Sequence, residues 1–216
     1  MENKWAEPLR LLIQQYAGRK HPLDYKSRYQ LVVMVILSAQ DSDKHINELA
    51  PSFFAVYPDM QTLALAQPED LYPLLSTVRN FANKCGWLVK LAQITASAAG
   101  IPTTMTELTK LPGIGRKSAN VIMRESGVKA EGIIVDLHVV RVAPRLGIAT
   151  GTNPEKIEKQ LMSIIPPEQW GDAGMAISFL GREICRPTHP KCDICVMNKV
   201  CHYRNPDQKQ FDPELF

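Results

Sequence analysis

The sequence predicts an all-α protein, and three observations lead to that class. Apolar residues recur at the spacing of a helix face along nearly all of the 216 residues. Apolar and polar residues do not alternate over any long run, and the β-like stretch Ile133–Val135 is too short to found a sheet. The chain has no internal repeat. A fold of helices packed around a shared core accounts for this pattern.

Three helices are expected in the first quarter of the chain. The first has one apolar face, formed by Trp5, Leu9, Leu12, Ile13 and Tyr16. Residues 28–39 are apolar all round, which predicts a central helix that is buried on every side. A third helix is marked by Ile46, Leu49, Phe53 and Phe54. Pro51 lies within it and must kink or break it, because proline has no backbone N–H and its ring crowds the preceding turn.

The rest of the chain predicts eight further helices. They are expected at residues 59–66, 68–77, 82–98, 104–111, 116–126, 136–146, 154–164 and 172–184. The helix of residues 82–98 has its apolar face at Leu88, Leu91 and Ala92, and it should end at Gly100, since glycine commonly terminates helices.

Composition and charge narrow the class of protein without identifying it. Hydrophobic residues make up 45% of the chain and charged residues 22%, so it can bury a core. The net charge of +3 is too small to prove a nucleic-acid partner. The strongest apolar run, Leu31–Leu37, is far too short to cross a bilayer and lies too far along the chain for a signal peptide. We expect an intracellular protein without a membrane partner, in the cytoplasm or nucleoid if it is bacterial.

Four of the five cysteines crowd near the C-terminus. Cys185, Cys192, Cys195 and Cys201 have the spacing C-x6-C-x2-C-x5-C. In a reducing compartment we expect no structural disulfide, so the four thiols point to one compact metal centre. A four-cysteine zinc site is the generic alternative, although zinc ribbons usually offer two C-x-x-C pairs and this segment has one. Cys85 stands apart and is expected to pack as a small apolar residue.

The most informative short segment is Leu108–Ala119, in which a tight turn precedes a helix. Gly113 and Gly115 flank an apolar residue, let the backbone turn sharply and present no Cβ to a neighbouring polymer. The first N–H groups of the next helix point outward with the positive end of the helix dipole behind them, which suits a phosphate. The turn by itself fits a plain connection between two helices equally well.

Two charged residues stand at helix starts. Lys117 lies in the first turn of its helix, directly after Arg116. A cation is electrostatically unfavourable there, and a lysine is a nucleophile only while its amine is uncharged. An ordinary surface lysine is the alternative. Asp136 follows the apolar run of residues 132–135 and precedes the next helix, a position that a helix N-cap alone explains.

The segment of residues 182–204 is locally basic. It contains five basic and two acidic residues, a local excess of three positive charges, which equals that of the whole chain. Arg186 and Lys191 lie in the first gap between the cysteines. We expect this segment to clamp phosphates as a second site beside the hairpin, with a solvated charged face as the alternative.

The pattern Leu-Pro-Gly-Ile-Gly-Arg-Lys-Ser-Ala-Asn at residues 111–120 resembles the helix–hairpin–helix DNA-binding element of the endonuclease III family. Lys117 matches the nucleophilic lysine of that family. Residues 135–142 resemble its second signature, in which Asp136 works with the lysine. The cysteine spacing matches the loop that holds a 4Fe-4S cluster in the family. The similarity covers nearly the whole chain and includes Gln40, which in the family enters the gap left by a flipped nucleotide.

The resemblance implies an enzyme of base-excision DNA repair. It would be a bifunctional DNA glycosylase and AP lyase that removes damaged bases, with oxidised pyrimidines expected, through a Schiff base on Lys117 and then β-elimination. Asp136 would stabilise positive charge at the sugar or handle protons. Its partner would be double-stranded DNA with a damaged base or abasic site, bound by a monomer. The residues expected to contact DNA are Gln40, Gly113, Gly115, Arg186 and Lys191.

The family's architecture further implies two helical lobes. A six-helix lobe would cover residues 25–133 and contain the hairpin at 108–122. Residues 1–24 would pack with 134–216 around the cluster.

One stretch departs from the family pattern. Residues 78–81 read Val-Arg-Asn-Phe where a glycine, an apolar wedge and a tyrosine are usual, so Asn80 takes the place of the wedge. Contact with the strand opposite the lesion, and the preference for the opposing base, are therefore open. Leu137 also stands where a small polar residue is more common, with no expected effect on the carboxylate of Asp136.

Two other functions stay open. One is a monofunctional glycosylase for a mismatched base; Lys117 counts against it, because such relatives commonly carry tyrosine or serine there. The other is a DNA-binding or redox-sensing iron–sulfur protein without catalysis, which would need neither Lys117 nor Asp136.

Overall fold

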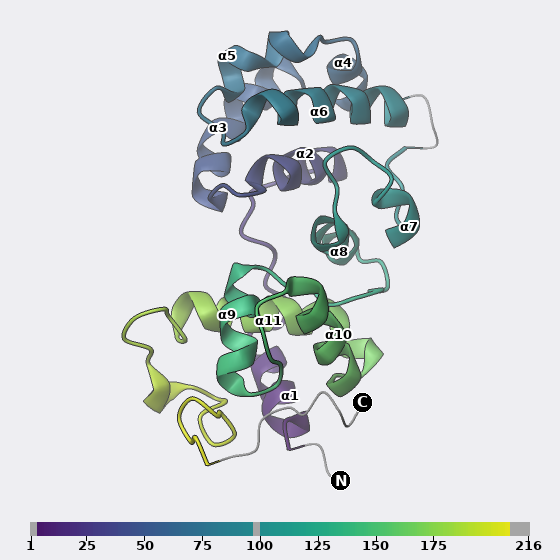
Figure 1. The fold of residues 1–216 in the computed structure, drawn as a ribbon. Helices are drawn as coiled ribbons and strands as arrows, with labels where there is room; N and C mark the ends of the chain where they lie inside the picture. Colours follow the sequence, from purple (N-terminus) through teal and green to yellow (C-terminus); the bar gives the residue numbers. More distant parts are fainter. Residues whose placement is uncertain (1–3, 97–99, 208–216) are drawn as a thin grey trace. The chain divides into compact units, whose positions relative to one another are not determined.

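The computed structural model describes residues 4–96 and 100–207, and within these ranges every regular element is a helix. The predicted all-α class is therefore confirmed (Figure 1). The elements of the first part are α1 Ala6–Gln15, α2 Arg28–Ser38, α3 Asp43–Val56, α4 Met60–Ala64, η1 Pro68–Leu71, α5 Tyr72–Leu75, α6 Phe81–Ala96, α7 Met105–Leu108 and α8 Arg116–Glu125. Those of the second part are α9 Leu137–Leu146, α10 Pro154–Ile164, η2 Pro167–Gln169, α11 Trp170–Glu183 and η3 Cys192–Ile194. Among the described helices, none is long and apolar enough to cross a membrane.

The chain divides into two compact units. One consists of residues 20–128, and the other joins residues 1–19 to residues 129–216. The lobe boundaries expected from the sequence, 25–133 and 1–24 with 134–216, stay a prediction.

The unit of residues 20–128 is built around α2. Seven consecutive residues of this helix, Leu31–Leu37, are buried, and the helix contacts α3, α6 and α8 (Figure 1). On the far side of α6, the short α4 packs along it. An apolar surface all round suits a helix with neighbours on several sides, as the sequence predicted. The predicted helix of residues 68–77 is instead two short pieces, η1 and α5, with prolines near the start of each.

Pro51 does not break α3, which runs from Asp43 to Val56. Of the predicted kink or break, the break is wrong, because residues on both sides of the proline are held by burial. The kink stays a prediction. Ile46, Ala50 and Phe53 are all buried in the core. Burial of one large apolar side chain contributes roughly 1.5–3 kcal/mol, so Ile46 and Phe53 together offset the cost of about 3 kcal/mol for an internal proline.

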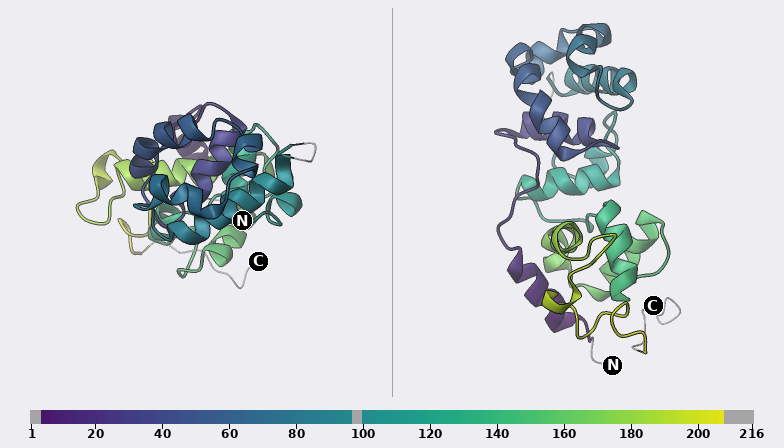
Figure 2. Two further views of the ribbon diagram at one scale, coloured as in Figure 1. Left: turned by 90° about the horizontal axis from the view of Figure 1, so that it is seen from above. Right: turned by 90° about the vertical axis from the view of Figure 1, so that its left-hand side faces the viewer.

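The other unit centres on α11. This helix packs along α9 and is covered on another side by α1, so that the N-terminal helix joins residues from the C-terminal half (Figure 2). The stretch Ile133–Val135 is buried and forms no strand. It runs directly over Gly174 of α11, where a Cβ would lie 2.4 Å from the carbonyl oxygen of Ile134. The glycine lets backbone pass against backbone, and this contact leads the chain to the start of α9.

Candidate active site

The predicted hairpin forms a capped helix, a turn and a second helix. Thr104 caps α7: its hydroxyl accepts from the N–H of Glu107 at 3.3 Å and donates to the Glu107 carboxylate at 2.8 Å. In the turn, the N–H of Ile114 donates to the carbonyl of Leu111 at 3.2 Å, and Gly113 has φ 77°. A proline followed by a left-handed glycine is the pattern of a type II turn, so the sequence specifies this conformation locally.

The two glycines of the hairpin have different surroundings. A Cβ on Gly113 would lie 3.1 Å from Cε3 of Trp87 and 3.2 Å from Cγ2 of Ile36, so this residue must be small as well as left-handed. A Cβ on Gly115 would meet nothing within 4 Å. Gly113 therefore serves the fold, whereas Gly115 leaves open space beside the start of α8.

The start of α8 carries no side-chain cap. Gly115 is its N-cap in an extended conformation and has no side chain to accept from the first amides. Lys117 lies in this first turn and is exposed. Within its own unit, no described carboxylate forms an ion pair with its amine. A helix start without a side-chain cap can accept an anion, and the phosphate contact expected there from the sequence stays a prediction.

Gln40 lies on a loop whose shape is fixed by a buried lysine. The loop leaves the end of α2, and Gln40 is exposed with φ 61°, an unusual conformation for a residue other than glycine. Lys84 of α6 is only 1% exposed, and its Nζ donates to the carbonyls of Leu37 and Ala39 at 2.7 Å each. Burial lowers the pKa of Lys84, while the nearby Asp41 carboxylate opposes that shift. The sequence analysis missed Lys84, because a lysine in an amphipathic helix usually marks its solvated face.

A second strained loop is tied to the first through Asp41. Its Oδ2 accepts from the N–H of Arg79 at 3.0 Å, and its Oδ1 contacts Nδ1 of His45 at 2.9 Å. The His45 Nε2 in turn lies 3.1 Å from the Thr77 hydroxyl. Burial raises the pKa of Asp41, but the hydrogen bonds it accepts outweigh this and leave the pKa below its ordinary value. Asn80, the residue in the wedge position, follows Arg79 and also has a left-handed φ of 59°.

Asp136 is the N-cap of α9, as the local pattern predicted. Its Oδ1 accepts from the N–H groups of His138 at 2.8 Å and Val139 at 2.9 Å. Its Oδ2 accepts from the hydroxyl of Ser178 at 2.6 Å and lies 3.8 Å from Nη2 of Arg182. The carboxylate keeps 13% of its side-chain surface exposed, so it is oriented by donors yet reachable.

Sequence reasoning missed Ser178 and assigned Arg182 only to a basic surface. A signal was present: the two residues lie four apart, so they share one face of α11. What the sequence did not specify is that this face meets the start of α9.

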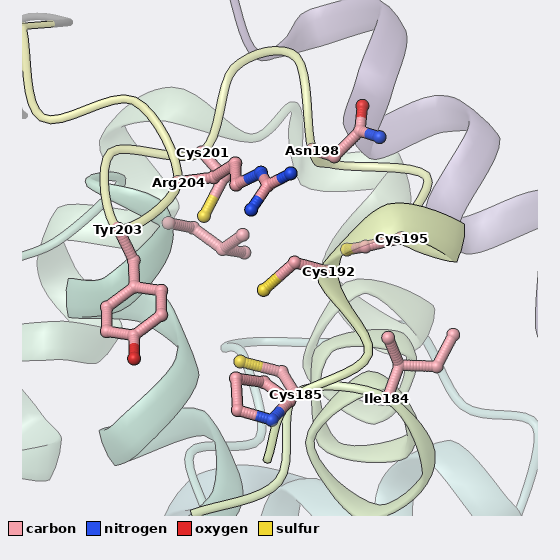
Figure 3. A pocket seen from close by; sticks show the side chains of 10 residues that line it. Ile184, Cys185, Cys192, Cys195, Asn198, Cys201, Tyr203 and Arg204 are labelled. Atoms are coloured by element: carbon pink, nitrogen blue, oxygen red, sulfur yellow. The ribbon is translucent and has the colours of Figure 1, made fainter. Parts of the chain in front are cut away.

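The four cysteines of the C-terminal segment line one pocket (Figure 3). All four are free thiols, and the sulfur atoms of Cys185, Cys192 and Cys201 point into a shared space. The rest of the lining is contributed by Leu146, Ile184, Pro190, Asn198, Tyr203 and Arg204. Among the described residues, no three Cys, His, Asp or Glu side chains are grouped closely enough to hold a single ion.

Burial changes the pKa of two of these thiols. It raises the pKa of Cys195 to about 11 and also raises the pKa of Cys201. Without a positive centre these thiols stay protonated at neutral pH, so binding an iron or zinc centre must release protons. Such burial of potential ligands fits a structural centre better than a reactive thiol site.

Arg145 of α9 holds the loop between the first two cysteines. Its Nη1 donates to the carbonyl of Arg186 at 2.8 Å, and its Nη2 donates to that of Pro187 at 3.0 Å. The same guanidinium lies over the ring of Tyr203, 5.1 Å from its centroid. The predicted phosphate ligands Arg186 and Lys191 are both exposed on this loop. The sequence did not predict this role of Arg145, because a basic residue in the last turn of a helix is common.

The predicted residues thus fall into three groups. Gly113, Gly115 and Lys117 share the hairpin and the first turn of α8, while Gln40 stands on a separate loop of the same unit. Asp136 belongs to the other unit, as do Arg186, Lys191 and the four cysteines.

Comparison with known proteins decides the family. A family model for HhH-GPD superfamily base excision DNA repair proteins matches residues 33–167. Endonuclease III from Synechocystis sp. is 34% identical over 200 residues, which span 91% of this chain and 90% of that protein. The chain belongs to the endonuclease III family. The Rickettsia conorii member is 36% identical over 187 residues, 85% of this chain and 88% of its own length.

Solved structures of the endonuclease III family have the same fold. A trapped covalent endonuclease III–DNA intermediate superposes with a TM-score of 0.82 at 29% identity and covers 93% of this chain and 95% of its own. A non-covalent endonuclease III–DNA complex also gives 0.82, at 30% identity, covering 92% and 94%. A thermostable thymine-DNA glycosylase reaches 0.76 at 19% identity, a likeness of fold alone, covering 93% and 94%.

Proposed function

We propose that this chain is a bifunctional DNA glycosylase and AP lyase of base-excision repair, with Lys117 as its nucleophile. The observation that carries the proposal is an exposed lysine in the uncapped first turn of α8, in a member of the endonuclease III family. Its partner is duplex DNA with a damaged base or an abasic site. The solved complexes of endonuclease III with DNA, to which this chain is similar, support this choice.

The hairpin and the basic loop supply contacts to the DNA backbone. The uncapped start of α8 offers amides and the positive end of its dipole to a phosphate, with open space beside Gly115. Arg186 and Lys191, exposed on the loop that Arg145 holds, offer charge to other phosphates. Gln40, fixed in its left-handed conformation by the Lys84 clamp on the preceding residues, is suited to fill the space left by a flipped nucleotide.

The chemistry follows from the amine and the carboxylate. The Nζ of Lys117 forms a bond to C1′ of the flipped nucleotide, the glycosidic bond breaks, and its electron pair leaves with the base, which takes up a proton. The sugar ring opens to give a Schiff base on Lys117. Loss of a C2′ proton then expels the 3′ phosphate and cuts the strand. Asp136 stabilises the positive charge that develops at the sugar.

We further propose that Cys185, Cys192, Cys195 and Cys201 hold a 4Fe-4S cluster. Four free thiols that line one pocket, in a member of the endonuclease III family, support this proposal. When bound, the cluster supplies covalent cross-links between segments and a redox centre. The steps of base removal described above use only side chains of the chain.

Substitution Cys192→Ala tests this role of the cysteines. Without one of its ligands the cluster should be lost, and the loop carrying Arg186 and Lys191 should lose its order, so thermal stability and DNA affinity should fall together. Cys85→Ala is the matched control, since Cys85 is buried away from the pocket in the other unit. Metal analysis of anaerobically purified protein should give iron; zinc without iron would contradict the assignment, and normal DNA affinity in a cluster-free variant would contradict the positioning role.

The function itself is tested with a panel of duplexes, each containing one damaged base or an abasic site. Base release and strand cleavage are measured separately on each duplex. The proposal expects both products, with oxidised pyrimidines among the preferred bases. Base release without cleavage or a trapped adduct would identify a monofunctional glycosylase, and neither product on any duplex would leave a DNA-binding protein without catalysis.

A further inference from the structure

The carboxylate of Asp136 is surrounded by more donors than a helix cap needs. Two amides occupy Oδ1, which is the ordinary arrangement of an N-cap. On Oδ2 a third donor, the hydroxyl of Ser178, lies at 2.6 Å, and the Arg182 guanidinium stands 3.8 Å away. The Nε of Arg182 also reaches the Ser178 hydroxyl, at 3.5 Å. The three side chains form a chain from a cation, through a hydroxyl, to a carboxylate.

Ser178 is an unexpected residue at its position. It is 0% exposed, and the neighbouring buried residues of α11 are apolar, among them Ile177, Phe179 and Leu180. A buried hydroxyl is costly unless it is hydrogen-bonded, and a helical serine commonly satisfies itself on the carbonyl four residues earlier. Here the hydroxyl donates across to α9 instead. Packing alone would be served as well by alanine, so the hydroxyl has a role beyond packing.

We propose that Ser178 and Arg182 are positioning residues that hold the carboxylate of Asp136 in one fixed orientation, from which it serves the reaction. This inference rests on the proposed function, because it assumes that Asp136 serves the reaction. A carboxylate has about four acceptor sites, of which three are occupied here. The two amides fix Oδ1, and the Ser178 hydroxyl fixes Oδ2. The arrangement therefore holds both oxygens of the carboxylate in place.

The reaction step follows from this assignment. As the glycosidic bond breaks, positive charge grows on the sugar, and a negative charge that is already oriented stabilises it without reorganisation. Removal of Ser178 should therefore weaken this electrostatic contribution, because the carboxylate is no longer held in one orientation.

Substitution Ser178→Ala tests the proposal. The measurement is single-turnover base release at neutral pH from a duplex with one thymine glycol, for Ser178→Ala, for Asp136→Asn and for the double variant, together with affinity for a duplex with a tetrahydrofuran abasic analogue. We expect base release by Ser178→Ala to be about tenfold slower, since a hydrogen bond to a charged group typically contributes at least that factor. The double variant should be no slower than Asp136→Asn alone, because Ser178 acts through Asp136, and affinity of Ser178→Ala for the analogue should be unchanged.

A matched control and two companion variants separate positioning from structure. Ser163→Ala removes another helical hydroxyl of the same unit, which donates only to the Gln160 carbonyl at 2.7 Å, and it should change nothing. Arg182→Gln should slow base release less than Ser178→Ala does, with no further loss in the Asp136→Asn background, and Arg182→Lys should restore most of the rate. These Arg182 variants also test the proposal if Ser178→Ala does not fold.

The outcomes distinguish this inference from the proposed function. A folded Ser178→Ala with the rate of the unmodified protein would overturn the inference alone. A loss of rate that adds in full to that of Asp136→Asn would also overturn it, since a merely structural serine would act in that way. If the unmodified protein releases no base from any duplex of the panel, the proposed function fails and this inference falls with it.

Discussion

Two helix starts in this protein are built in opposite ways. The start of α8 has glycine as its N-cap, carries no side-chain acceptor and opens into space beside Gly115. The start of α9 has Asp136 as its N-cap, and the amides of its first turn are already bonded to Oδ1 of that residue. Both starts carry the same partial positive charge. One leaves it available to an outside anion, whereas the other uses it to hold a carboxylate of its own.

The two arrangements match the roles proposed for Lys117 and Asp136. A nucleophilic amine must reach an external carbon, so Lys117 is exposed and without an ion pair in its unit. An electrostatic helper works only from a fixed position, so Asp136 is tied by two amides, a hydroxyl and a nearby guanidinium. A helix start can thus leave a reactive side chain free to move, as at Lys117, or hold a charged side chain in place, as at Asp136.

Substitution of Lys117 should have the largest effect. Lys117→Gln removes the amine and keeps a polar side chain of similar reach, so the borohydride-trapped protein–DNA adduct should disappear and base release should slow strongly. The fold and the cluster colour should be unaffected, because Lys117 is exposed and supports no other residue. Lys110→Gln, on the other side of the same hairpin, is the control. An undiminished adduct in the Lys117 variant would assign the chemistry to another amine.

Substitution of Asp136 should have the next largest effect, and two variants divide its roles. Asp136→Asn keeps the acceptor for the helix cap but removes the charge, so base release should slow on the order of 100-fold with little change in stability. Asp136→Ala removes both, so it should slow the reaction equally and in addition lower the free energy of unfolding by about 1 kcal/mol. Single-turnover rates and chemical denaturation measure the two quantities. Equal rates in Asp136→Asn and the unmodified protein would reduce this residue to a helix cap.

Substitution of the hairpin glycines should have the smallest effects, on stability at Gly113 and on DNA binding at Gly115. Gly113→Ala should lower the free energy of unfolding by about 2 kcal/mol, because its φ is left-handed and its Cβ would press on Trp87 and Ile36. Gly115→Ala should cost at most about 1 kcal/mol and mainly weaken binding to duplex DNA, because its Cβ enters the open space proposed for a phosphate. Denaturation and DNA-binding titrations of both variants check this. A Gly115 variant that binds DNA normally would argue that no phosphate approaches this helix start.

The local parts of the site were predictable from the sequence. Gly113 follows Pro112 in a turn that needs a left-handed third residue, and Asp136 stands directly before a helix, so both conformations are specified within a few residues. The helix of residues 154–164 was likewise predicted with the observed bounds, since Asn153 and Pro154 mark its start.

The supporting residues were not predictable, because they act across long separations in the chain. Lys84 reaches carbonyls 45 and 47 positions away, and Ser178 donates to a carboxylate 42 positions away. A single sequence shows that Lys84 lies on a helix but not which helix end it faces. At Pro51 the error is of the opposite kind. The proline is a strong local helix breaker, yet burial of its neighbours keeps α3 continuous.

The central claim is that the amine of Lys117 bonds to the sugar, and the most direct test is to find the atom that carries it. The unmodified protein is incubated with an abasic duplex in the presence of borohydride, and the adduct is digested with protease and nuclease and mapped by mass spectrometry. The account predicts that the sugar remnant is attached to Nζ of Lys117. A remnant on the N-terminal amine or on any other lysine would contradict it.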